Sequence, residues 1–124
     1  MTPTIPLPFS ADAIHGKTFH FIGIGGCGMS GLAHIIQRLG ATVQGTDAVE
    51  STVTDNLIQH GIPVSFEQDG SEISTRVDVV VHSAAIPDNH PEIMSSDRLG
   101  IPLVTYSKML GIVQTRHTGV CIAG

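Results

Sequence analysis

The stretch from Phe19 to Ala33 constrains the fold most, because an apolar run ends in clustered glycines and a helical pattern follows at once. Gly23, Gly25 and Gly28 fit G-x-G-x-x-G between a predicted strand and a predicted helix. In such a loop the first glycine permits a tight turn, the second the approach of a diphosphate, and the third close packing of the helix on the sheet. Free N–H groups and the helix dipole then attract an anion.

We therefore predict a diphosphate site at the glycine loop and the first helical turn. Its candidate residues are Gly25, Gly26, Cys27, Gly28, Met29 and Ser30. Asp47 ends the next apolar run, about twenty residues further on, where a ribose-binding carboxylate is expected. The alternative for Asp47 is a helix N-cap or a solvated turn, and we interpret Cys27 as a small residue that fills space.

The rest of the chain alternates between apolar runs and helical patterns, which is typical of a parallel α/β sheet. We expect a Rossmann-like sheet of about five to six strands with helices on both faces. The expected strands are 18–24, 42–46, 64–66, 77–82, 103–105 and 119–123, and the expected helices are 28–39, 52–60, 91–99 and 107–114, with Ser51 or Thr52 and Ser107 as caps. Residues 1–17 are expected to form an extended arm, and residues 18–124 a single domain.

The carboxyl end of a parallel sheet is where its ligand binds, so the loop after the valine-rich strand is a further candidate. Ser83, Ala84 and Ala85 stand there and offer small side chains with one hydroxyl. The alternative for Ser83 is a plain strand-end hydroxyl. His82 precedes this loop, and we favour a hydrogen-bonded structural histidine over a ligand-binding one.

Composition excludes several classes of function. A net charge of −5 and a pI near 5.7 argue against a nucleic-acid surface. We expect no membrane span, since no run of about eighteen apolar residues is present, and no secretory signal at the start. The two cysteines, Cys27 and Cys121, form no disulfide framework, which fits the cytoplasm. None of the seven histidines has metal-ligand spacing, so no metal site is expected.

Several segments resemble the N-terminal domain of the Mur ligases. Phe21 to Gly31 matches the family pattern Gly-Ile-Gly-Gly-x-Gly-Met-Ser-Gly, and Gly45-Thr46-Asp47 resembles its Gly-Ser-Asp. Val80 to Ile86 resembles Val-Val-x-Ser-Ser-Ala-Ile, with Ala84 in place of the second serine. The segment from Val120 to Gly124 resembles the strand that enters the family's ATP-binding loop.

The resemblance implies a role in peptidoglycan precursor synthesis, within an ATP-dependent ligase that joins L-alanine to UDP-N-acetylmuramate. This domain would hold the UDP part of that substrate, and Gly124 would begin the ATP-binding loop. ATP, Mg²⁺ and L-alanine would bind in domains that the 124 residues do not include, so we expect this chain alone to be inactive. Two segments depart from the family: Glu67-Gln68 replaces Gly-His, and Thr105 to Lys108 replaces a basic pair and its neighbours.

Three other interpretations stay open. The glycine pattern and Asp47 equally suit a regulatory NAD-binding module, and the Mur ligase that recycles tripeptides is a near relative of the family member above. A purely structural α/β module is the third. Binding of UDP compared with NADH would separate these classes.

Overall fold

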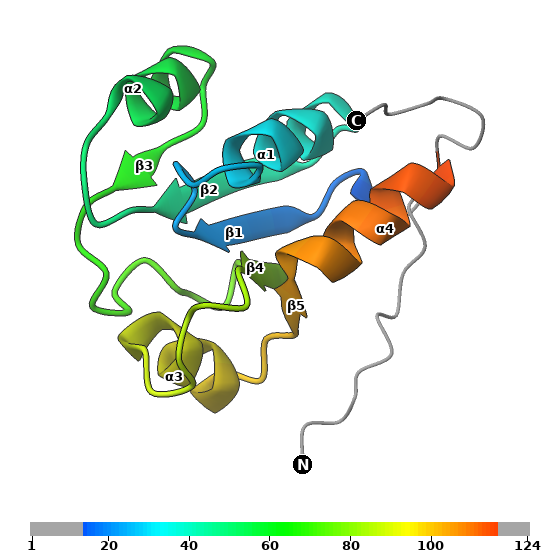
Figure 1. Ribbon diagram of the computed structural model, residues 1–124. Helices are drawn as coiled ribbons and strands as arrows, with labels where there is room; N and C mark the ends of the chain where they lie inside the picture. The colour runs from blue at the N-terminus through cyan, green and yellow to red at the C-terminus, as the bar shows by residue number, and fades with distance from the viewer. Residues whose placement is uncertain (1–13, 117–124) are drawn as a thin grey trace.

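The computed structural model describes residues 14–116. Strands and helices alternate along this part of the chain (Figure 1). In chain order they are β1 (Thr18–Ile22), α1 (Met29–Arg38), β2 (Thr42–Thr46), α2 (Thr52–Gln59), β3 (Val64–Ser65), β4 (Val79–His82), α3 (Pro91–Arg98), β5 (Leu103–Thr105) and α4 (Tyr106–Arg116). The strand expected at 119–123, together with Cys121 and Gly124, lies outside the described residues.

The described strands form one parallel sheet in the order β3-β2-β1-β4-β5, so the predicted fold class is confirmed. β1 lies at its centre, where Phe21 is paired with Gly45 of β2 on one side and with Val81 of β4 on the other. The chain builds outward from β1 to β3 and then crosses back to add β4 and β5. The strand order therefore reverses between β1 and β4, and a crevice is expected at their carboxyl ends.

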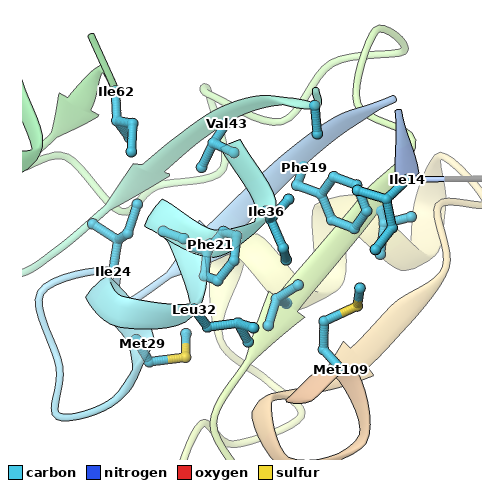
Figure 2. Packing of buried hydrophobic residues seen from close by; sticks show 14 of the residues in the cluster. Ile14, Phe19, Phe21, Ile24, Met29, Leu32, Ile36, Val43, Ile62 and Met109 are labelled. Carbon is cyan, nitrogen blue, oxygen red and sulfur yellow. The ribbon is translucent and has the colours of Figure 1, made fainter. Parts of the chain in front are cut away.

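Alternation along β1 supplies both faces of the sheet, because successive side chains of a strand point in opposite directions. Phe19 and Phe21 belong to a large buried cluster with residues of α1, α2 and α4 (Figure 2). Ile22 belongs to a smaller cluster on the other face, beneath α3, whose buried members are Ile22, Ile73, Val77, Val80, Ile93 and Ile101. Figure 1 shows α1 and α4 on one side of the sheet and α3 on the other. Helices thus cover both faces, as predicted.

The predicted boundary between the arm and the domain is wrong for the last residues of the arm. Ile14 is fully buried in the large cluster, and the Gly16 N–H donates to the Gly40 carbonyl at 3.0 Å. Burial of an isoleucine side chain stabilises a fold by about 1.5–3 kcal/mol, which explains why this segment packs on the sheet. The folded unit therefore includes residues from Ile14 onward.

Helix starts follow local capping chemistry. Ser51 is the N-cap of α2 and forms a reciprocal capping box with Thr54. Pro91 opens α3 as predicted, and the His90 ring nitrogen accepts from the Glu92 N–H at 3.0 Å. The prediction that Ser107 caps the last helix is wrong. β5 runs directly into α4, and the Thr105 hydroxyl accepts from the Lys108 N–H at 3.3 Å.

Gly45 offers a test of the central strand pair. A Cβ at this position would lie 2.8 Å from the Phe21 carbonyl oxygen and 2.7 Å from Ile24 Cδ1. Because the carbonyl belongs to the paired strand and cannot move aside, we expect Gly45→Ala to lower the free energy of unfolding by about 1–3 kcal/mol. Urea denaturation measures this change.

Gly111→Ala in α4 is the matched control, because a Cβ there meets nothing within 4 Å. Alanine is favoured over glycine in a helix by about 1 kcal/mol, so this variant should be as stable as the wild type or more stable. A Gly45→Ala protein as stable as the wild type would contradict the close β1–β2 packing.

Candidate nucleotide-binding site

The loop between β1 and α1 is fastened to the end of β2. The N–H groups of Gly23 and Ile24 both donate to the Thr46 carbonyl, at 2.8 and 2.9 Å. Gly23 has φ +78°, a conformation that favours glycine, so the predicted tight turn is confirmed. The Gly25 N–H donates to Asp47 Oδ2 at 2.8 Å. These bonds fix where the following amides point.

Further along the loop, some backbone N–H groups donate to carbonyl groups of the same loop and others have no protein acceptor. The Gly26 N–H donates to the Gly23 carbonyl at 3.0 Å, and the Met29 N–H donates to the Gly26 carbonyl at 3.1 Å. Within residues 14–116, no protein acceptor takes the remaining N–H groups at this helix start, which are those of Cys27, Gly28, Ser30 and Gly31. We call these four groups the amide cluster.

The amide cluster has the features of an anion site. No side chain caps α1, and its first turn carries no acidic residue. Unpaired N–H groups and the positive end of the helix dipole then face the same place. Of the predicted diphosphate residues, Cys27, Gly28 and Ser30 offer free donors, whereas Gly25, Gly26 and Met29 do not. Gly31 was missed, because sequence spacing alone does not show which amides the loop consumes.

The structure shows why a side chain is not tolerated at Gly25 and at Gly28, and these reasons differ from the predicted ones. A Cβ on Gly25 would lie 2.9 Å from Asp47 Oδ2 and 2.9 Å from Thr54 Cγ2, so the packing of the loop against Asp47 and α2 also requires glycine here. A Cβ on Gly28 would lie 2.6 Å from the Tyr106 hydroxyl oxygen, so the close neighbour is α4 rather than the sheet. The predicted reason for Gly28 is therefore wrong, the approach of a diphosphate to Gly25 stays a prediction, and both positions require glycine.

Asp47 directly follows β2 and holds the loop in place. Its Oδ2 accepts from Gly25, and its Oδ1 accepts from the Val49 N–H at 3.2 Å. The N-cap alternative for this residue is wrong, because Ser51 caps α2. Each carboxylate oxygen keeps a second lone pair, so Asp47 can also accept from a ligand hydroxyl.

The loop after β4 lies at the same edge of the sheet, because β4 is paired with β1. Ser83 Oγ accepts from the Ala85 N–H at 3.3 Å, and Ala84 and Ala85 are exposed. The predicted wall of small residues is therefore accessible. His82 Nδ1 donates to the Ser83 carbonyl at 2.9 Å, which agrees with its interpretation as a structural histidine. Cys27 is exposed, so the interpretation that it fills space is wrong.

A buried polar network beneath α3 was missed by the sequence analysis. Glu92 and His20 are fully buried, and Glu92 Oε1 accepts from His20 Nε2 at 3.0 Å and from the Thr46 hydroxyl at 2.7 Å. The Gln44 amide donates to His20 Nδ1 at 2.8 Å, which places the ring proton on Nε2. Gln68 donates to the Thr46 hydroxyl at 3.2 Å. No spacing rule indicates the network, because its members come from distant segments.

The network connects α3 and the β3–β4 loop to the strand that carries the glycine loop. Thr46 takes part twice, through its side chain to Glu92 and Gln68 and through its carbonyl to the loop. Gln68 belongs to one of the two segments that depart from the family pattern. Its amide points toward the sheet end and anchors the β3–β4 loop there.

In residues 14–116 no cluster of three or more His, Cys, Asp or Glu side chains is placed to hold a metal ion. None of the helices between Ile14 and Arg116 has both the length and the apolar character needed to cross a membrane.

A parallel sheet with a glycine loop where the strand order reverses defines a Rossmann-like α/β domain. Residues 18–118 match the Mur ligase family, catalytic domain, and the chain belongs to this family. The UDP-N-acetylmuramate–L-alanine ligase of Agathobacter rectalis is 41% identical over 106 residues, which cover 85% of this chain and 23% of the relative. That of Desulforamulus reducens is 40% identical over 109 residues, with coverage of 87% and 24%. The chain thus spans about a quarter of the length of these curated relatives.

Solved structures of ligases with UDP-N-acetylmuramate in their names are also similar to this chain. The UDP-N-acetylmuramate-alanine ligase MurC of Thermotoga maritima matches with a TM-score of 0.78 and 29% identity, over 84% of this chain and 24% of that protein. The UDP-N-acetylmuramate:L-alanyl-gamma-D-glutamyl-meso-diaminopimelate ligase of Neisseria meningitides matches with a TM-score of 0.70 and 30% identity, over 77% and 30%. Shikimate dehydrogenase of Aquifex aeolicus shares the fold, with a TM-score of 0.55 and 14% identity over 81% of this chain and 46% of that protein.

A double-mutant cycle tests the buried network. His20→Leu leaves the Glu92 carboxyl with one fewer donor, and loss of a partner from a buried hydrogen-bonded group costs about 1–3 kcal/mol. Glu92→Met leaves the His20 N–H and the Thr46 hydroxyl without their acceptor, at about 1–3 kcal/mol for each buried group. The double variant removes both halves, so it should cost clearly less than the sum of the single variants. Urea denaturation of all four proteins measures the coupling, and additivity within about 0.5 kcal/mol would contradict the pairing.

Proposed function

We propose that this chain is the UDP-substrate-binding domain of an ATP-dependent ligase that joins L-alanine to UDP-N-acetylmuramate in peptidoglycan precursor synthesis. The observation that carries the proposal is the amide cluster at the start of α1, in the segment that matches the family pattern. The names of the curated relatives and of both ligase structures include UDP-N-acetylmuramate, which supports a shared nucleotide substrate.

In this proposal the diphosphate lies on the amide cluster. The loop offers four unpaired N–H donors and carries no lysine or arginine between Gly23 and Gly31. Backbone donors held by the rest of the fold need no reorganisation to bind an anion, which suits a chain with a net charge of −5. The ribose lies one strand over, where Asp47 accepts from its hydroxyls, and Ser83, Ala84 and Ala85 form the other side of the site.

The remaining chemistry is proposed for parts of the ligase outside the described residues. Gly124 would begin the loop that binds ATP with Mg²⁺, and ATP would supply the activation of the muramyl carboxylate toward L-alanine. This domain contributes by holding the distant end of the substrate, because remote binding energy positions a reacting group. We propose a cytoplasmic enzyme, and we propose residues 14–124 as the extent of the UDP-binding domain.

The tripeptide-recycling ligase is the second candidate within the family, and the similarity to the Neisseria meningitides structure favours keeping it. The name of that enzyme also contains UDP-N-acetylmuramate, so the two candidates differ in the amine that is joined. Activity assays of the full-length ligase with L-alanine and with the tripeptide would separate them.

Nucleotide choice tests the proposal against a regulatory NAD-binding module. We expect titration calorimetry to show binding of UDP to the 124-residue chain and no binding of NADH under the same conditions. The free donors at the helix start suit the diphosphate of either nucleotide, and the expectation of UDP comes from the family match and from the UDP-N-acetylmuramate in the names of the relatives. Binding of NADH tighter than UDP would overturn the assignment.

Asp47→Ala tests the ribose contact. A hydrogen bond to a charged group contributes about 1.5–3 kcal/mol, so UDP affinity should fall about ten- to hundredfold. Asp47→Asn should lose less, because its amide oxygen can still accept from Gly25 or from the ribose. A 2′,3′-dideoxy UDP is the matched control, since it should bind the wild type and Asp47→Ala with more similar affinities. A lower thermal midpoint with unchanged affinity for both ligands would restrict Asp47 to holding the loop.

A further inference from the structure

Tyr106 lies against the amide cluster although it comes from the far end of the chain. It is the first residue of α4, directly after β5, and therefore starts at the carboxyl edge of the sheet. A Cβ on Gly28 would lie 2.6 Å from its hydroxyl oxygen and 2.9 Å from Cζ, so the phenol end of the ring touches the glycine loop. The ring also packs against the large hydrophobic cluster, which fixes its position.

The phenol hydroxyl is accessible and is held against the glycine loop. Within residues 14–116 no hydrogen bond is formed by the Tyr106 hydroxyl, and its half-buried side chain ends against Gly28, whose N–H group belongs to the amide cluster. The hydroxyl is not among the enclosed unpartnered side-chain atoms of residues 14–116, so it is accessible to a ligand and has a proton to donate. A hydroxyl and several N–H groups that all have a proton to donate need an acceptor between them, and a phosphate oxygen supplies one.

We propose that Tyr106 is a substrate-binding residue whose hydroxyl donates to an oxygen of the diphosphate on the amide cluster. This inference rests on the proposed function and extends it to α4. The site is then closed by residues from both ends of the fold, with Gly28 as the point where they meet. Gly28 must lack a side chain so that the Tyr106 hydroxyl can reach this position.

Tyr106→Phe isolates the hydroxyl, because phenylalanine keeps the ring and its packing. We expect the thermal midpoint to stay within a degree or so of the wild type and UDP affinity to fall about tenfold or more, as expected for loss of a hydrogen bond to a charged group. Affinity for pyrophosphate should fall by a similar factor. Affinity for uridine, which has no phosphate, should not change.

Ser107→Ala is the matched control variant. Ser107 is the next residue of α4, and its exposed hydroxyl lies 3.4 Å from the Thr105 hydroxyl rather than at the loop. This variant should bind UDP like the wild type, which separates loss of a specific hydroxyl from disturbance of the helix start.

The outcomes separate this inference from the proposed function. Tyr106→Phe binding UDP and pyrophosphate as tightly as the wild type would overturn the inference and leave the proposed function standing. An equal loss for uridine would also overturn it, since the hydroxyl would then not act on phosphate. Failure of the wild type to bind either UDP or pyrophosphate would overturn the proposed function and this inference together.

Discussion

The carbonyl group of Thr46 is the point on which the rest of the structure depends. It accepts from both Gly23 and Ile24 and so bends the chain sharply off β1. The carboxylate of Asp47, the next residue, accepts a hydrogen bond from the Gly25 N–H. With these donors consumed, the amides that remain free are those at the start of α1. The hydrogen bonds that shape the loop thus also select which groups are left for a ligand.

The same residue connects the glycine loop to α3 and to the β3–β4 loop. The Thr46 hydroxyl donates to Glu92 of α3 and accepts from Gln68. These two bonds hold the end of β2 in place, while the Thr46 carbonyl holds the glycine loop. Glu92 Oε2 is buried and has no partner among the described residues. A buried carboxyl group with one unsatisfied oxygen has a desolvation cost, which the hydrogen bonds of Oε1 to His20 and Thr46 offset in part.

Local patterns predicted the fold well, because each element carries its own signal. The valine-rich run predicted the strand observed as β4, Pro91 marked a helix start, and Gly40 and Gly100 follow helix ends with φ of +97° and +73°. For the candidate site, the sequence indicated the correct region of the fold but not which individual residues have free donors. Sequence spacing located the loop and Asp47, but which amides stay free depends on hydrogen bonds made across the sheet.

The long-range contacts were beyond sequence reasoning for the same physical reason. His20 and Glu92 are 72 residues apart, and Tyr106 reaches Gly28 only because β5 ends at the same sheet edge as β1. Similarly, the burial of Ile14 follows from packing against the assembled sheet, and no local pattern marks it.

The most direct measurement is a UDP titration followed through the backbone amides in ¹H–¹⁵N correlation spectra. The account predicts the largest shifts for the amides of Cys27, Gly28, Ser30 and Gly31, since these donate to no protein acceptor in the described residues. Gly23 and Ile24, whose amides are held by Thr46, should shift much less. Saturating UDP that leaves the four cluster amides unmoved, or that shifts a different edge of the sheet, would contradict the account.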